Sequence, residues 1–154
     1  METKTLTAEE TSAITGSLEH LLADSYALLA MTQVAHWNVE GPHFFQLHTA
    51  FQGQYEELFA AVDDIAEHLR ALGAYAPGGL TMLQELTAIG QIERRLSSKD
   101  FVAELLDAHD TLMARAKEGR RIACEAGDTQ TEDLFIERLR VHEKTAWMLR
   151  SHLK

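Results

Sequence analysis

The sequence predicts an all-α fold, a four-helix bundle with one short extra helix in a long middle connection. Helix breakers are few, because only two of the 154 residues are proline and glycine-rich stretches are confined to short segments. Between these breaks, apolar residues recur every three or four positions, which is the period of a helix. Val, Ile and Thr show no alternating runs of the kind that indicates strands.

The first two helices have the clearest signals. The first is expected from near Thr7 to about Val39, because Thr7-x-x-Glu10 has the spacing of a capping box, in which a hydroxyl and a carboxylate satisfy free backbone N–H groups. The second is expected over 44–72, where one apolar seam follows steps of three and four. That seam consists of Phe44, Leu47, Phe51, Tyr55, Leu58, Val62, Ile65, Leu69 and Leu72.

The second half of the chain predicts the remaining elements. A short helix over 80–88 fits the connection after the second helix. A third helix is expected over 97–126 and a fourth from 129 nearly to the end, opened by Ser97-x-x-Asp100 and Thr129-x-x-Glu132. Residues 1–154 are therefore expected to form one domain, with 1–6 as a short N-terminal tail.

Composition restricts the classes of partner. The chain has 24 acidic and 14 basic side chains, a formal charge of −10. This charge disfavours nucleic acid and anionic membranes and favours cations. No apolar stretch is long enough to span a membrane, and the N-terminus lacks a signal peptide, so a cytoplasmic protein is expected. Cys124 excludes an internal disulfide and is expected to be a small buried or half-buried side chain.

Four residues are candidate metal ligands: His36, His48, Asp63 and Glu67. The two histidines lie six residues on either side of Pro42. If the first two helices form an antiparallel hairpin that turns there, both histidines lie at one level. Asp63 and Glu67 are four residues apart and share one helix face, where their repulsion favours a bound cation.

The distance between these pairs indicates a second subunit. His48 and Asp63 are 15 positions apart, which at about 1.5 Å per residue is roughly 22 Å along a helix. One ion cannot span that distance, so either the pairs are unrelated or a two-fold contact joins the histidines of one chain to the carboxylates of another. Such mixed ligands suit iron, with zinc or manganese as competitors. A site inside one bundle needs Glu-x-x-His repeats on helices, and the only such spacing, Glu40 to His43, lies in the turn.

The run HWNVEGPHFFQLHTAFQGQYEELFAAVDDIAEHLRALG, residues 36–73, resembles the Dps family, the mini-ferritins of the ferritin-like superfamily, and EKTAWMLRSHL resembles that family's last helix. The resemblance implies a ferritin-like bundle in a hollow shell of twelve identical subunits. It implies ferroxidase activity, with Fe(II) oxidised by hydrogen peroxide or oxygen at two-fold interfaces and ferric mineral stored inside, which protects against oxidative damage. The family's catalytic ligands fall on His36, His48, Asp63 and Glu67.

Three other features of the sequence allow two interpretations each. The family usually has a carboxylate where this chain has Gln52. In one interpretation, Glu56 compensates for the missing carboxylate through a water molecule. In the other, Gln52 only forms a hydrogen bond nearby. Trp37 corresponds to a tryptophan that lies near the site and intercepts radicals, although an interface anchor explains it equally well. An acidic cluster either lines the family's pores for ions or complements a helix dipole. That cluster consists of Glu125, Asp128, Glu132 and Asp133.

Two other functions compete with ferroxidase activity. A DNA-compacting stress protein would need Lys-rich tails, because such binding rests on counterion release. The N-terminal segment instead sets Lys4 against Glu2, Glu9 and Glu10, so DNA binding ranks below ferroxidase activity. In the third interpretation the bundle is purely structural and its histidines and acids are incidental.

Overall fold

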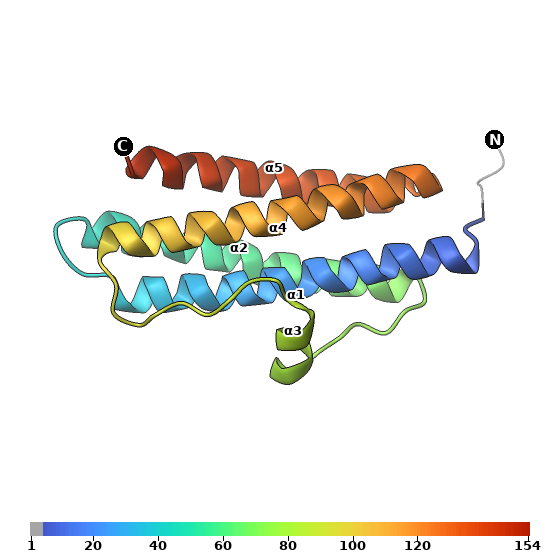
Figure 1. Ribbon diagram of the computed structural model, residues 1–154, viewed down its shortest axis with the longest axis horizontal. Helices are drawn as coiled ribbons and strands as arrows, with labels where there is room; N and C mark the ends of the chain where they lie inside the picture. Colours follow the sequence, from blue (N-terminus) through green and yellow to red (C-terminus); the bar gives the residue numbers. More distant parts are fainter. Residues whose placement is uncertain (1–4) are drawn as a thin grey trace.

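The structure is a computed structural model that describes residues 5–154, so most of the predicted tail lies outside the described residues. Five helices follow one another along the chain, and no strand occurs within residues 5–154. They are α1 (Ala8–Asn38), α2 (Phe44–Ala71), α3 (Leu80–Leu86), α4 (Ser98–Ala126) and α5 (Thr129–His152) (Figure 1). The prediction of an all-α fold is therefore confirmed.

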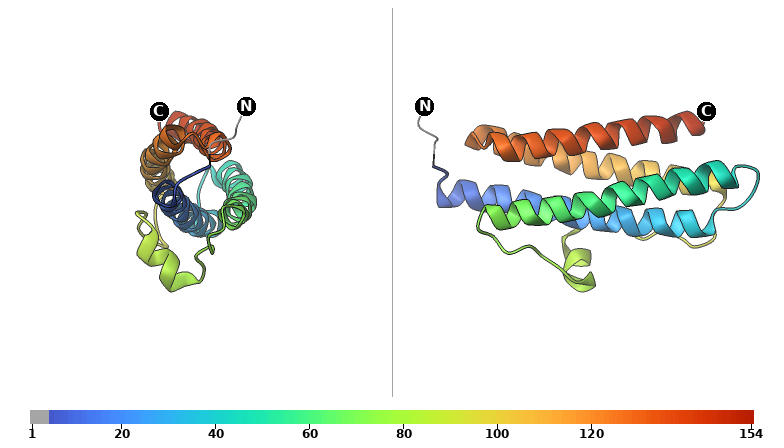
Figure 2. Two further views of the ribbon diagram at one scale, coloured as in Figure 1. Left: turned by 90° about the vertical axis from the view of Figure 1, so that its right-hand side faces the viewer. Right: turned by 180° about the vertical axis from the view of Figure 1, so that it is seen from behind.

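The four long helices lie side by side around one core. α1 and α2 form one antiparallel hairpin, α4 and α5 form another, and the connection that carries α3 runs between the hairpins along the outside of α1 (Figure 1). The end-on view in Figure 2 shows α3 set apart from the ring of long helices. This arrangement is the predicted bundle with a crossover.

The apolar seam of α2 faces the core. Six of its nine predicted members are buried, and Phe44, Tyr55 and Leu72 are partly buried against them. The buried six are Leu47, Phe51, Leu58, Val62, Ile65 and Leu69. Because one face of α2 is buried in this way, most positions on its opposite face are exposed to solvent, including Asp63 and Glu67.

The helices α1, α4 and α5 all begin where the sequence predicted, and the predicted capping residue is correct in two cases of three. Thr7 and Glu10 form the capping box of α1, and Ser97 caps α4 by accepting the backbone N–H of Asp100 at 3.0 Å. The predicted cap of α5 at Thr129 is wrong, because Asp128 is the N-cap and accepts the N–H of Thr131 at 3.1 Å. A carboxylate one position earlier complements the positive end of the helix dipole better than a hydroxyl does.

Two further predictions need correction. α3 ends at Leu86 instead of residue 88, and Thr87 is its C-cap. Cys124 is exposed, not buried, because Ala123 and Ala126 form the buried face of α4 at that turn.

Asp24 fixes the connection after α3 to the bundle. Its carboxylate is fully buried on α1 and accepts from Thr87 Oγ1 at 2.8 Å, Ala88 N at 2.9 Å and Arg115 Nη1 at 3.1 Å. Arg115 also donates to the carbonyl of Leu86 at the end of α3. One buried, charge-assisted network therefore holds α1, α4 and the connection together.

Within the described residues, no helix is both long and apolar enough to cross a membrane.

Candidate metal centre

His36 and His48 meet where α1 and α2 approach the turn between them. Their rings stack with centroids 3.7 Å apart and planes 18° apart. Each Nδ1 lies 2.8 Å from the backbone carbonyl oxygen of the other histidine. The prediction that the two residues lie at one level is confirmed.

These two hydrogen bonds fix the tautomer of both rings. A carbonyl oxygen can only accept, so Nδ1 carries the proton and donates in both histidines. Each Nε2 is then left with a free lone pair, which is the form of imidazole that binds metal ions. The arrangement presents two neutral nitrogen ligands whose orientation is set by the backbone.

Two aromatic side chains of α2 support the histidine pair. Phe44 stacks on His48 with ring centroids 4.9 Å apart, and Tyr55 meets His36 edge-on at 5.1 Å. His36 is 7 % exposed, and His48 is half-buried. Trp37 is 64 % exposed, so its ring does not pack in the core of the bundle, and this exposure agrees both with an interface anchor and with a position near a bound metal.

Asp63 and Glu67 lie on the solvent side of α2, because Val62 and Ile65 bury the opposite side. Neither carboxylate forms a hydrogen bond or an ion pair with any other residue in the described part of the chain. The subunit by itself therefore leaves both charges in water and unneutralised.

The helix that carries these carboxylates is held in place just beyond Glu67. His68 Nε2 donates to Thr131 Oγ1 at 2.8 Å, and that hydroxyl donates to Asp128 Oδ2 at 2.5 Å. The chain of hydrogen bonds joins the C-terminal end of α2 to the first turn of α5.

Neither pair of candidate ligands forms a metal site within one subunit. Across residues 5–154, no three side chains of the His, Cys, Asp and Glu types come close enough together to hold a metal ion. A complete ligand set of imidazoles and carboxylates requires groups from outside the single chain.

Gln52 and Glu56 lie exposed on α2 after His48. The Gln52 amide Nε2 donates to Glu56 Oε1 at 2.8 Å. This contact agrees with the interpretation in which Gln52 hydrogen-bonds nearby. It also leaves the Gln52 carbonyl oxygen without a partner among the described residues, so that oxygen can serve as an uncharged ligand.

Most of the predicted pore acids are engaged within the chain. Glu125 pairs with Arg121 at 2.5 Å, and Glu132 pairs with Arg120 at 3.3 Å. Asp128 caps α5, whereas Asp133 is exposed and forms no hydrogen bond or ion pair with the residues from 5 onward. The cluster thus carries less free negative charge than its composition predicts.

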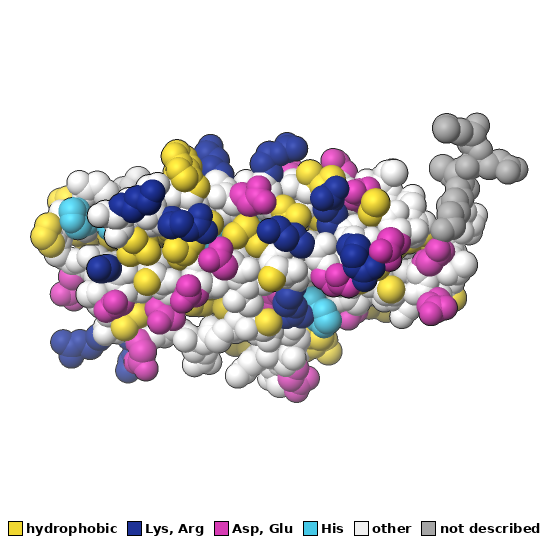
Figure 3. Space-filling model, turned by 45° about the horizontal axis from the view of Figure 1, so that its top comes forward, with side chains coloured by type: hydrophobic (Ala, Val, Ile, Leu, Met, Phe, Trp, Pro, Cys, Tyr) yellow, Lys and Arg dark blue, Asp and Glu magenta, His cyan; other side chains and the backbone are white. Residues whose placement is uncertain are grey.

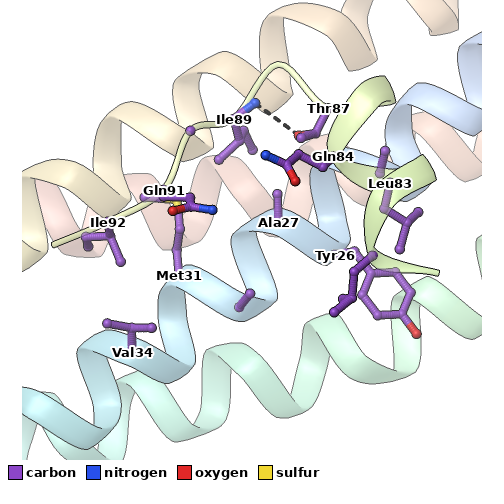
Figure 4. Close-up of a pocket in the computed structure, with 14 residues that line it drawn as sticks. Tyr26, Ala27, Met31, Val34, Leu83, Gln84, Thr87, Ile89, Gln91 and Ile92 are labelled. Atoms are coloured by element: carbon purple, nitrogen blue, oxygen red, sulfur yellow. Dashed lines mark hydrogen bonds between the residues drawn. The ribbon is translucent and has the colours of Figure 1, made fainter. Parts of the chain in front are cut away.

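An apolar groove of about 440 Å³ lies between α1 and the connection that follows α3 (Figure 4). Its wall on α1 includes Ala27, Met31 and Val34, and its rim includes Tyr26, which is 41 % exposed, and Leu80, which is 86 % exposed. Sequence reasoning missed this groove. The available signal was that apolar residues occur on all sides of α1, which is typical of a helix that is covered on every side.

The chain resembles known proteins along nearly its whole length. The family model described as "Ferritin-like domain" matches residues 16–154. An uncharacterised low temperature-induced protein of Nostoc sp. is 34 % identical, over 97 % of this chain and 84 % of the relative. The "DNA protection during starvation protein" of Helicobacter pylori is 33 % identical, over 88 % of this chain and 95 % of the relative. The crystal structure of Dps from Staphylococcus aureus superposes with a TM-score of 0.90 at 28 % identity, covering 97 % and 99 % of the two chains.

Proposed function

Because the chain belongs to the ferritin-like family, and within it to the Dps proteins, we propose that it oxidises ferrous iron at sites shared between two identical subunits. One subunit supplies His36 and His48, and its neighbour supplies Asp63 and Glu67. The observation that carries this proposal is the histidine pair, whose hydrogen bonds leave both Nε2 lone pairs available to a metal. The subunits form a closed cytoplasmic shell of twelve that stores the ferric product.

Charge and ligand type favour iron as the substrate. Asp63 and Glu67 are anionic and unpaired, so they attract and hold a hard divalent cation most strongly. The neutral imidazoles then complete a mixed nitrogen and oxygen set with open positions for an oxidant. Zinc and manganese prefer overlapping ligands and are expected to compete for the same position.

The oxidation balances with hydrogen peroxide as the oxidant. Two ferrous ions give up one electron each, the O–O bond of the peroxide breaks, and its two oxygen atoms are reduced to the level of water. Ferric ions hydrolyse to an oxyhydroxide mineral and release protons to solvent. Oxygen acts in the same way, but it accepts four electrons when it is reduced to water, so one molecule of oxygen oxidises four ferrous ions.

The surface of the subunit is suited to a second copy. The apolar groove on α1 is bordered by exposed Tyr26 and Leu80, and Phe59 on α2 is 69 % exposed. Contiguous apolar surface, such as the groove with Tyr26 and Leu80 at its rim, is typical of an interface. A two-fold contact across this face pairs each histidine set with the other chain's carboxylates and makes two sites.

A subunit-mixing experiment tests the shared site. One chain carries His36→Ala and His48→Ala, and the other carries Asp63→Ala and Glu67→Ala, with different affinity tags. Each homogeneous assembly should be inactive in Fe(II) oxidation. When the chains are coexpressed and mix at random, about half of the two-fold contacts contain one chain of each kind. In each of these contacts, one of the two sites has both intact halves. About a quarter of the parent activity should therefore be recovered.

The control is coexpression of two differently tagged copies of the same defective chain, which should recover nothing. Light scattering must show that all assemblies have the parent size, near twelve subunits. Mixed particles that contain both chains but oxidise no iron would show that the four residues do not form a site between subunits.

A further inference from the structure

The bundle core contains a polar cluster that the proposed iron site does not use. His109 of α4 and His142 of α5 are 2 % and 1 % exposed, and their Nδ1 atoms lie 2.9 Å apart. Arg138, 6 % exposed, donates from Nη2 to His142 Nε2 at 3.2 Å and also pairs with Glu57 of α2. The cluster therefore joins α2, α4 and α5 in the middle of otherwise apolar packing.

The direction of these hydrogen bonds is determined by Arg138. A guanidinium can only donate, so His142 Nε2 is an acceptor and His142 carries its proton on Nδ1. That Nδ1–H donates to His109 Nδ1, which is then the acceptor. The remaining proton of His109 is on Nε2, which is buried and has no hydrogen-bond partner.

Both rings therefore have no free position for another proton. A proton on His109 Nδ1 would set two N–H groups against each other at 2.9 Å, and a proton on His142 Nε2 would face an N–H of Arg138. Each protonation replaces a hydrogen bond with a contact between two donors. It also adds a charge beside a buried guanidinium, which is costly in the core.

The carboxylates near the pair do not offset such a charge. Glu57 is already engaged by Arg138. On α1, which packs against α4, the buried carboxylate is Asp24, and it pairs with Arg115, six positions along α4 from His109. Asp110, next to His109, is exposed and pairs with Arg150 at 3.5 Å.

We propose that the His109–His142 pair is an acid-sensitive switch in the bundle core, in which uptake of a proton by either ring breaks the packing of α4 on α5. This inference does not depend on the iron site. It requires only that the pair stays neutral while the bundle is closed and becomes protonated when the bundle opens.

The expected pH range follows from the two states. Burial, and then the charge of Arg138, lowers the pKa of His109 to about 4 in the folded protein. Burial, His109 and Arg138 lower the pKa of His142 as well. In the unfolded chain both pKa values return to about 6.5, so the unfolded state binds more protons below that pH. Stability is therefore full above about pH 6.5 and is lost as the pH falls.

Denaturant unfolding of the metal-free, full-length assembly tests the switch at fixed protein concentration. From about pH 7.5 to about pH 5, His109 alone should raise the unfolding equilibrium constant roughly 30-fold. The double variant His109→Gln/His142→Gln cannot take up these protons, and its acid response should be smaller by at least that factor. The matched control is His152→Gln, which replaces an exposed histidine and should respond to acid like the parent.

A second measurement decides the question if the double variant does not fold. Histidine ring NMR of the parent protein at about pH 5 should show two rings that remain neutral while exposed rings are protonated. Two core rings that titrate near pH 6.5 in the folded protein would overturn the proposal. A folded double variant with the parent's full acid response would overturn it as well.

Discussion

At the residue scale, Gln52 places an uncharged amide in the proposed iron site at the position where the Dps family usually has a carboxylate. Its amide donates to Glu56 and leaves an uncharged carbonyl oxygen on the exposed face of α2. An amide oxygen binds a hard cation more weakly than a carboxylate does. The second metal position next to His48 is therefore expected to be weak in this chain.

The variant Gln52→Glu should strengthen that position. The added charge attracts a second Fe(II), although repulsion from Glu56 costs the metal-free helix about 0.2–0.5 kcal/mol. Anaerobic Fe(II) titration by calorimetry should show more ions bound per subunit than in the parent. Gln46→Glu adds the same charge elsewhere on the exposed surface of α2 and should leave the number unchanged. Equal stoichiometry in Gln52→Glu and the parent would show that position 52 does not face the metal.

For single residues, the sequence predicts which side chains lie close together, but it predicts their hydrogen bonds less well. The spacing of His36 and His48 about Pro42 predicted their common level, because a hairpin maps symmetric positions onto each other. The reciprocal bonds to backbone carbonyls were not predictable, because they depend on the separation of two helices. The cap of α5 was assigned one residue late for a similar reason: Asp128 and Thr129 are both good caps, and the position of the first turn decides between them.

At the scale of elements, α4 and α5 are in tight contact at Gly119. A Cβ added there would lie 2.3 Å from Cζ of Phe135, a fully buried ring on α5. Gly119 thus has a packing role, and its low helix propensity is tolerated for that reason. The same pair of helices carries His109 and His142, whose rings are hydrogen-bonded to each other elsewhere along the interface.

Gly119→Ala should therefore destabilise the protein by about 1–3 kcal/mol, because the core must expand to admit one methyl group. Gly16→Ala in α1 is the matched control, since nothing lies within 4 Å of its added Cβ. It should instead stabilise the protein by about 0.5–1 kcal/mol through helix propensity. Denaturant unfolding of both variants measures the difference, and a neutral or stabilising Gly119→Ala would contradict the close packing.

The helices differ in how well the sequence predicts which of their faces is buried. The seam of α2 predicted its buried face because apolar and polar positions separate cleanly along that helix. The apolar residues of α1 are spread around the helix without one dominant face, so its pattern gives no direction, and the groove beside it was not predicted. The core pair of His109 and His142 was also missed, since a histidine with no partner nearby in the sequence carries no spacing signal.

At the scale of the whole molecule, charge is distributed unevenly between the two hairpins. Residues 8–71 carry ten acidic side chains and one basic side chain, a net charge of −9, whereas residues 98–152 carry eleven and nine, a net charge of −2. The hairpin of α1 and α2 therefore holds most of the negative charge, and it also holds all four proposed iron ligands. This distribution attracts cations to the proposed site over a distance of about a Debye length.

The same distribution bears on the alternative function, DNA compaction. The Lys and Arg side chains gather over α4 and α5, where Figure 3 shows them interleaved with acidic side chains. Two of the arginines are neutralised by close partners: Arg120 pairs with Glu132, and Arg121 with both Glu118 and Glu125. A surface of this kind releases few counterions from DNA, because each phosphate contact needs an uncompensated cation.

We therefore predict no appreciable binding to duplex DNA at neutral pH and physiological salt. Fluorescence anisotropy of a labelled duplex, titrated with the assembled protein at low and at physiological salt, measures this. Any weak binding at low salt should disappear as salt is raised, since only unspecific electrostatic contacts are available. The same protein with an appended lysine-rich segment is the positive control, because identical copies of that segment on one particle supply the missing cations. Tight binding by the unmodified protein at physiological salt, with a steep dependence on salt, would show that its surface presents free cations that the ion pairs of α4 and α5 do not account for.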